Sequence, residues 1–254
     1  EMCIRDRFSA VLAIGIISAI LFMKERVKRC SVKALMMKAV TSILFIFCGA
    51  IGSANALKHG YSIFPILILM GLVFGLLGDI WLDLKWIYKE DNDIYTFSGF
   101  FSFIVGHIFF ISAILQRFAE WDKIIYIVLP VVISLIAAVG MLILEKPLKM
   151  NYGKFKVITV VYTFIVALLA FLSGSLALMN GFKIMTLNLM FAGGIFFALS
   201  DLILSGTYFG ENKKRPIDII TNHTTYYAAQ FLIASSLMFL KSVSYTYLTL
   251  PTKA

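Results

Sequence analysis

The sequence predicts an all-α integral membrane protein, a bundle of eight transmembrane helices forming one transmembrane domain over residues 1–254. Three observations predict this class. Hydrophobic residues make up 60% of the chain, and the mean hydropathy is +0.90. Charged residues make up only 15%, against about 25% in soluble domains. The apolar residues gather in runs that match the roughly 17 to 25 residues needed to cross a bilayer.

The first four helices are expected at 8–23, 34–57, 63–82 and 96–115. The first run leads directly into "KERVKR", a basic anchor rather than the small-residue cleavage site of a signal peptide. The second run contains one charged residue, Lys38. The third run ends within "GLLGDIWLDL", and the fourth is the aromatic run around "FSGFFSFIVGHIFF".

The last four helices are expected at 124–144, 157–179, 185–208 and 224–240. Among these runs only the seventh carries a charge, Asp201. The linkers are short and carry nearly all the charged residues, so they leave no room for a soluble domain. The sequence therefore predicts one compact bundle, with no room for a second unit.

Lys and Arg predict the orientation of the bundle. The linkers after the first, third, fifth and seventh helices, such as "KERVKR" and "ENKKRP", hold more Lys and Arg than the opposite side. Basic loops remain on the cytoplasmic side of a membrane. The odd-numbered loops are therefore expected in the cytoplasm and both termini outside. For a bacterial chain, the expected location is the plasma (inner) membrane.

Several functional classes find no support in the sequence. Cys3, Cys30 and Cys48 form no recognisable metal or disulfide pattern. There is no phosphate-binding glycine loop, no zinc-ligand spacing and no GxSxG motif. Basic loops facing an anionic leaflet account for the net charge of +9, so no nucleic acid is expected. Neither a metal nor a cofactor is expected, and nothing in the sequence specifies an oligomeric state.

Acidic residues inside the expected spans are the main candidates for function. Asp79 and Asp201 lie within apolar helices, where a charge costs at least about 2.5–3.5 kcal/mol, so such residues usually face an interior cavity. Asp83 lies one turn after Asp79, just past the expected helix end, and we interpret it as an interfacial residue. A structural contact between helices is the alternative reading of the two deeper aspartates.

The two acidic stretches resemble each other, "FGLLGDIWL" at 74–82 and "FFALSDLIL" at 196–204. Three pairs of polar residues share nearly the same spacing: Asp79 with Asp201, Lys38 with Tyr162, and His107 with Gln230. This pattern predicts two parallel four-helix repeats. All six side chains are expected in the cytoplasmic half of the membrane or near its midplane, where they would line one cavity open to the cytoplasmic leaflet.

Glycines near the two aspartates predict close helix packing. Gly71, Gly75 and Gly78 form a smooth ridge leading to Asp79, and Gly193 and Gly194 precede Asp201. Small residues at such spacing let helix backbones approach each other.

The motifs "GLLGDIWLDL", "FIVGHIFFI", "FFALSDLILS" and "TTYYAAQFLIAS" resemble, in this order, those of the YhhN membrane family, which includes the animal lysoplasmalogenases. The stretch "KAVTSILFIF" resembles the family's second-helix motif, although Ala39 follows Lys38 where the family usually has Pro. The resemblance implies an eight-helix ether hydrolase acting on a lysophospholipid in the membrane, with water as co-substrate. It implies catalytic carboxylates at Asp79 and Asp201. The substrate-binding residues that it implies are Lys38, His107, Tyr162, Tyr226 and Gln230.

Vinyl ether hydrolysis suits two carboxylates. One acid protonates the outer vinyl carbon, and an anion stabilises the resulting oxocarbenium-like cation and accepts a proton from water. Two carboxylates in unlike surroundings divide such roles in glycoside hydrolysis. The sequence does not say which aspartate takes which role.

Two other functions fit the same residues. Buried carboxylates, a buried Lys and a parallel repeat also occur in small-molecule or proton-coupled transporters. A carrier needs access to both faces, whereas the six polar residues are expected toward one. A non-catalytic lipid-binding or assembly protein is the third reading, for which buried acids would be an unnecessary cost.

Overall fold

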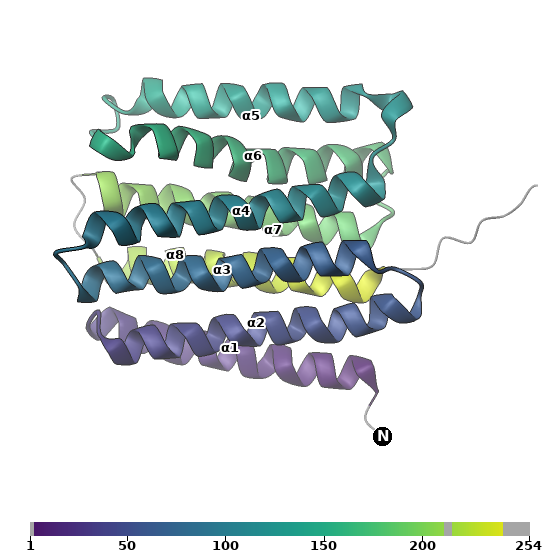
Figure 1. Cartoon of the computed structure of the whole chain (residues 1–254), viewed down its shortest axis with the longest axis horizontal. Helices are drawn as coiled ribbons and strands as arrows, with labels where there is room; N and C mark the ends of the chain where they lie inside the picture. The colour runs from purple at the N-terminus through teal and green to yellow at the C-terminus, as the bar shows by residue number, and fades with distance from the viewer. Residues whose placement is uncertain (1–2, 211–214, 241–254) are drawn as a thin grey trace, which may run out of the picture.

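A computed structural model describes residues 3–210 and 215–240. In this part of the chain the fold is all-α, with eight helices, as the sequence predicts (Figure 1). The helices are α1 (Ile4–Lys28), α2 (Val32–Lys58), α3 (Ile63–Ile87), α4 (Asn92–Phe118), α5 (Ile125–Leu144), α6 (Lys156–Met179), α7 (Met185–Phe209) and α8 (Pro216–Ser236). Three short 3-10 turns accompany them: Trp121–Lys123, Gly153–Phe155 and Leu237–Phe239.

Seven of the helices, α1 to α7, are long and apolar enough to cross a membrane, so the chain is a multi-pass integral membrane protein. The eighth helix, α8, is more polar. Its buried positions include Asn222, His223 and Gln230, which face other helices. A hydropathy average counts these polar residues as if they faced lipid. It therefore gives a low value for a helix whose polar side is covered by other helices.

Several helix boundaries differ from the predicted ones. The last helix begins at Pro216, well before the expected 224, because Pro suits the first turn of a helix, where its missing N–H has no partner to lose. The first helix continues to Lys28 and includes Glu25 and Arg26, which were expected in a loop. Both side chains are buried against neighbouring helices, so the helix does not end where the apolar run ends.

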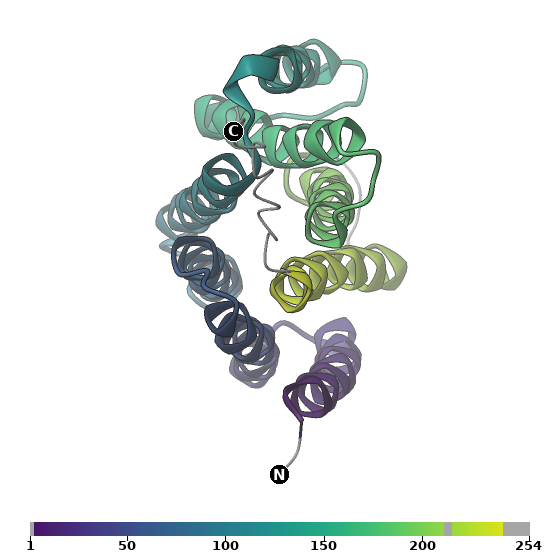
Figure 2. The same ribbon diagram turned by 90° about the vertical axis from the view of Figure 1, so that its right-hand side faces the viewer.

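The helices run nearly side by side along the long axis (Figure 1). Seen from the end, α2, α3 and α4 form one side of the bundle, and α1, α8 and α7 form the other (Figure 2). Contacts of α2 with α8 join the sides near one edge, and α6 joins α4 to α7 near the other. The outermost helix, α5, packs mainly against α6.

Inter-helix contacts follow the predicted repeat. The pairs α1–α2, α2–α3 and α3–α4 have counterparts in α5–α6, α6–α7 and α7–α8. The cross-contact of α2 with α8 likewise has a counterpart in that of α6 with α4. The contact of α1 with α8 has no counterpart of similar extent between α5 and α4, and the duplication itself stays a prediction.

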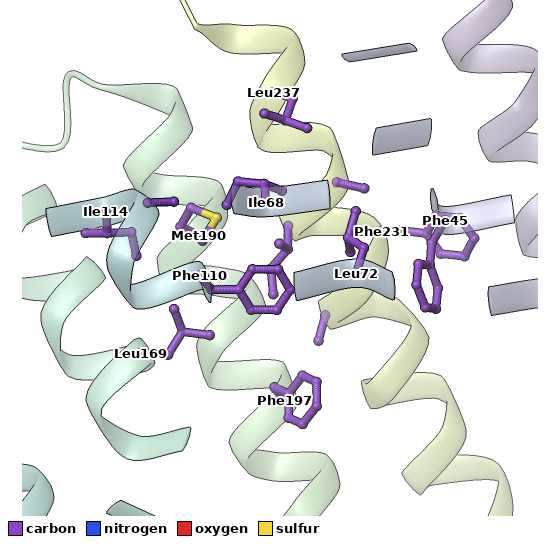
Figure 3. Packing of buried hydrophobic residues seen from close by; sticks show 14 of the residues in the cluster. Phe45, Ile68, Leu72, Phe110, Ile114, Leu169, Met190, Phe197, Phe231 and Leu237 are labelled. Atoms are coloured by element: carbon purple, nitrogen blue, oxygen red, sulfur yellow. The ribbon is translucent and has the colours of Figure 1, made fainter. Parts of the chain in front are cut away.

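The apolar core lies where α2, α3, α4, α6, α7 and α8 meet (Figure 3). Fully buried side chains from these helices interlock there: Phe45, Ile68, Leu72, Phe110, Leu169 and Met190. Large apolar side chains are also exposed along the helices, among them Ile17, Phe101 and Ile136. In a membrane protein, lipid chains cover such an exposed apolar surface.

The predicted glycine packing is confirmed, and Gly194 gives a test of it. A Cβ atom on Gly194 would lie 2.8 Å from Cα of Ala170, whereas one on Gly140 of α5 would have nothing within 4 Å. Gly194→Val is therefore expected to lower the free energy of unfolding by about 1–3 kcal/mol, as overpacking does. Gly140→Val is the matched control. Thermal unfolding in detergent checks this, and equal melting temperatures for the two variants would contradict the close α6–α7 contact.

Candidate active site

Asp79 lies on α3 and is only 2% exposed. Three hydrogen-bond donors from two other helices reach its carboxylate. On α2, the Lys38 Nζ lies 3.0 Å from Oδ1, and the Ser42 hydroxyl donates to Oδ2 at 2.6 Å. On α8, the Tyr226 hydroxyl also donates to Oδ2, at 2.7 Å. Lys38 and Ser42 are one helical turn apart, so they present their polar groups from one face of α2.

Asp83 is buried next to this group, and its interpretation as an interfacial residue is wrong. Only 2% of it is exposed. Its Oδ1 lies 3.2 Å from the Lys38 Nζ, and its Oδ2 lies 3.2 Å from Nη1 of Arg26. The reason is helical spacing. Asp79 and Asp83 share one face of α3, and α1 and α2 continue far enough to bring two cations to that face.

These residues form a row of four buried groups of alternating charge, Arg26, Asp83, Lys38 and Asp79. Their formal charges sum to zero, which is the condition under which charged groups are tolerated in an apolar interior. The Lys38 ammonium lies between two carboxylates and also reaches the backbone oxygen of Asp79 at 3.5 Å. The row therefore holds Asp79 next to a fixed positive charge.

Asp201 has different surroundings. It lies on α7 and accepts a hydrogen bond of 2.9 Å from the Tyr162 hydroxyl of α6. Over residues 3–210 and 215–240, no Lys or Arg forms an ion pair with it. Asp201 is half-buried, unlike Asp79. The pairs Lys38–Asp79 and Tyr162–Asp201 occupy corresponding positions of the predicted repeat, yet only the first provides a cation.

Both aspartates border one polar cavity of about 70 Å³. Arg26, Lys38, Asp83, Asn222, His223 and Tyr226 also line it. At its outer end the cavity borders Cys30, which is exposed, and Asp218, which is half-buried. This end lies where α1, α3 and α7 end and α8 begins, the side that the basic loops predict to be cytoplasmic. A cavity of this size with several polar side chains on its wall admits several water molecules.

Lys38 and Tyr226 line this cavity, but the other three predicted substrate-binding residues, Tyr162, His107 and Gln230, do not. The His107 Nδ1–H donates to the carbonyl oxygen of Phe103 at 2.8 Å, and the ring packs edge-on against Phe197. The Gln230 amide donates to the Tyr226 hydroxyl at 3.1 Å. Gly75 leaves the space for this amide, since a Cβ there would lie 2.6 Å from the Gln230 Nε2. Gln230 therefore supports Tyr226, which in turn contacts Asp79.

Sequence reasoning missed several polar residues of the site. Ser42 was detectable, because it follows Lys38 by one turn on an otherwise apolar helix. Arg26 was not, because it belongs to a basic stretch typical of a loop. His223 lies just before the expected start of the last helix at 224, but it is buried in α8 and borders the cavity. In the described residues, no three His, Cys, Asp or Glu side chains gather as metal ligands would.

The fold and site define a polytopic membrane protein with a cavity that is lined by several carboxylates and opens at one end of the bundle. The chain belongs to the YhhN family, whose model matches residues 29–237. This family includes lysoplasmalogenases. Neither a curated protein nor a solved structure matches the chain.

Proposed function

We propose that this protein hydrolyses the vinyl ether bond of a lysoplasmalogen, or of a related lysolipid, to a fatty aldehyde and a glycerophospho-base. One observation carries the proposal: Asp79 and Asp201 border the same small cavity, and within the described residues an ion pair forms at Asp79 but not at Asp201. The reaction needs an acid and an anion at neutral pH. Two carboxylates in unlike surroundings supply them.

The unlike surroundings assign the two roles. Lys38, Ser42 and Tyr226 together stabilise the ionised form of Asp79, because all three present hydrogen-bond donors to its oxygens. In the part of the chain that the structure describes, Asp201 receives one phenolic hydrogen bond, from Tyr162, and forms no ion pair. We assign proton delivery to Asp201 and electrostatic stabilisation to Asp79.

The reaction then proceeds with all atoms accounted for. Asp201 gives its proton to the outer vinyl carbon, which leaves an oxocarbenium-like cation and an aspartate anion. Asp79 stabilises the cation and takes a proton from the water that attacks it, forming a hemiacetal. The hemiacetal collapses to the aldehyde and the glycerol hydroxyl. Proton transfer through cavity water from Asp79 to Asp201 restores the starting state.

The direct test uses purified protein in proteoliposomes with three lysolipids that differ only in the chain linkage: vinyl ether, alkyl ether and acyl ester. Mass spectrometry is expected to find aldehyde and glycerophospho-base from the vinyl ether alone. Release of fatty acid from the ester would replace the proposal with an ordinary lysophospholipase. Uptake of lipid or solute without any product would favour the transporter.

Tyr226 offers a milder perturbation of the same site. Tyr226→Phe removes a donor from the Asp79 carboxylate and leaves the Gln230 amide without its acceptor. A hydrogen bond to a charged group contributes about 1.5–3 kcal/mol, so kcat/KM is expected to fall by about ten- to a hundredfold. Tyr227→Phe is the control, because this neighbouring buried hydroxyl donates at 3.4 Å to the backbone oxygen of Lys38. Equal losses in the two variants would contradict a specific role for Tyr226.

We also infer that the cavity opens to the cytoplasm, so that the lysolipid enters from the inner leaflet. The chain carries its own reporters, since Cys3 and Cys30 are exposed at opposite ends of α1 and Cys48 is buried. A membrane-impermeant maleimide is expected to label Cys3 in intact cells and Cys30 only after the membrane is opened. Cys3→Ser and Cys30→Ser variants assign each signal. The reverse pattern would invert the orientation.

A further inference from the structure

A second cavity, of about 440 Å³, lies between α5, α6 and α7. Its walls are mainly apolar and include Gly140 and Met141 of α5, Val166 and Ala170 of α6, and Ile195 and Ala198 of α7. We call it the α5–α7 groove. Its volume lies within the range of about 300–1,000 Å³ that is usual for sites of small molecules.

The groove faces the lipid side of the bundle. Leu144, Phe171 and Leu202 line it and are also exposed apolar side chains on three helices that are long enough to span a membrane. The outermost helix, α5, packs mainly against α6, which lies between α5 and α7 (Figure 2), and residues of all three helices line the groove. A lipid chain therefore has a path into the groove from the bilayer.

The groove meets the polar cavity at three shared residues, Asp201, Leu204 and Tyr208. On one side of Asp201 lie the charged groups Lys38, Asp79 and Asp83, and on the other side lies an apolar channel. Such a junction matches a molecule with a polar end and a single aliphatic chain.

We propose that the α5–α7 groove binds the alkenyl chain of the lysolipid, with the vinyl ether held at Asp201. This rests on the proposed function and adds the position and direction of its substrate. In a lysoplasmalogen the vinyl ether lies where the aliphatic chain meets the glycerol. A chain in the groove and a glycerol in the polar cavity therefore bring the outer vinyl carbon to the Asp201 carboxyl.

The groove selects chains by shape rather than by affinity. A chain that leaves the bilayer for the groove exchanges one apolar surrounding for another and gains little free energy. What the groove adds is position, because a chain along α6 fixes the reacting carbon relative to Asp201. Narrowing the groove is therefore expected to impair long chains that must fill it, and to spare short ones.

Gly140 allows the groove to be narrowed without disturbing the fold. It lines the groove, and a Cβ there would have no heavy atom within 4 Å. Gly140→Phe is expected to lower kcat/KM for a hexadecenyl lysoplasmalogen by at least about tenfold and for an octenyl one by less than about twofold. Gly206→Phe is the matched control. A Cβ on Gly206 is equally free, and Gly206 borders neither the groove nor the polar cavity.

A second measurement does not depend on turnover. An alkyl-ether lysolipid with a photoreactive diazirine at the chain end is expected to label α5, α6 and α7 at groove residues such as Met141 and Ala170. Gly140→Phe is expected to remove this labelling, and Gly206→Phe to preserve it.

The combined results separate the two claims. Groove labelling in a protein that cleaves no lysoplasmalogen would leave the groove as a lipid-chain site and overturn the proposed function. Vinyl ether cleavage with equal effects of Gly140→Phe on both chain lengths, or with labels spread evenly over the lipid-facing helices, would overturn the groove and leave the hydrolase.

Discussion

Asp201→Asn is expected to abolish vinyl ether cleavage while the protein stays folded in the membrane. Asn has the shape of Asp but has no acidic proton to deliver to carbon. General acid catalysis contributes about 10²- to 10⁴-fold in rate, and kcat is expected to fall by at least that factor. Asp201 forms no ion pair within the described residues, so its substitution leaves no charge unpaired, and the melting temperature should change little.

The assay is aldehyde release in proteoliposomes, with thermal unfolding measured on the same preparations. Asp122→Asn is the control, because Asp122 lies in the exposed turn between α4 and α5, away from both cavities. Asp79→Asn is also expected to lose activity by the same order, but with reduced stability, since it leaves the Lys38 ammonium short of one partner. Unchanged turnover in either active-site variant would remove that aspartate from the mechanism.

Lys38→Met is expected to give the largest loss of stability of any single substitution in the site. It removes one positive charge from the row of Arg26, Asp83, Lys38 and Asp79, and leaves a net negative charge in an apolar interior. Breaking a buried ion pair from one side costs about 3–5 kcal/mol. The free energy of unfolding in detergent should fall by that amount.

A second substitution tests whether the unbalanced charge explains the loss of stability in Lys38→Met. Asp83→Asn added to Lys38→Met returns the row to a formal charge of zero, with one cation and one carboxylate remaining. The double variant is expected to be more stable than Lys38→Met alone. A double variant that is less stable than the single one would show that packing of the Lys38 side chain, and not charge balance, explains the loss.

Features of the fold that follow from short stretches of sequence were predictable. Runs of apolar residues predicted eight helices, and seven of these, α1 to α7, are long and apolar enough to cross a bilayer. The glycines near Asp79 and Asp201 predicted close contacts between helices, because a residue without a side chain lets a neighbouring helix approach. Helix ends were less predictable. The α1 helix continues through Glu25 and Arg26 because neighbouring helices cover these charges, which is a property of the folded bundle.

The site was predictable in its residue types and not in its partners. Spacing alone paired Lys38 with Tyr162 and Asp79 with Asp201 as positions in a repeat. It gave no indication that Arg26 from α1 reaches Asp83, because that contact joins residues far apart in sequence. The buried position of Asp83 follows from this contact. The same limit explains why only the structure distinguishes the two aspartates: whether a cation lies beside a carboxylate is decided by helix packing.

Isotope labelling tests the central claim most directly, because acid–base cleavage of a vinyl ether determines which solvent isotopes each product contains. Hydrolysis in D₂O, followed by immediate reduction of the aldehyde, is expected to place one deuterium on the carbon next to the carbonyl carbon. Hydrolysis in ¹⁸O-water is expected to leave the glycerophospho-base free of ¹⁸O. An aldehyde without that deuterium, or a glycerophospho-base that contains ¹⁸O, would contradict carbon protonation by the two-aspartate site.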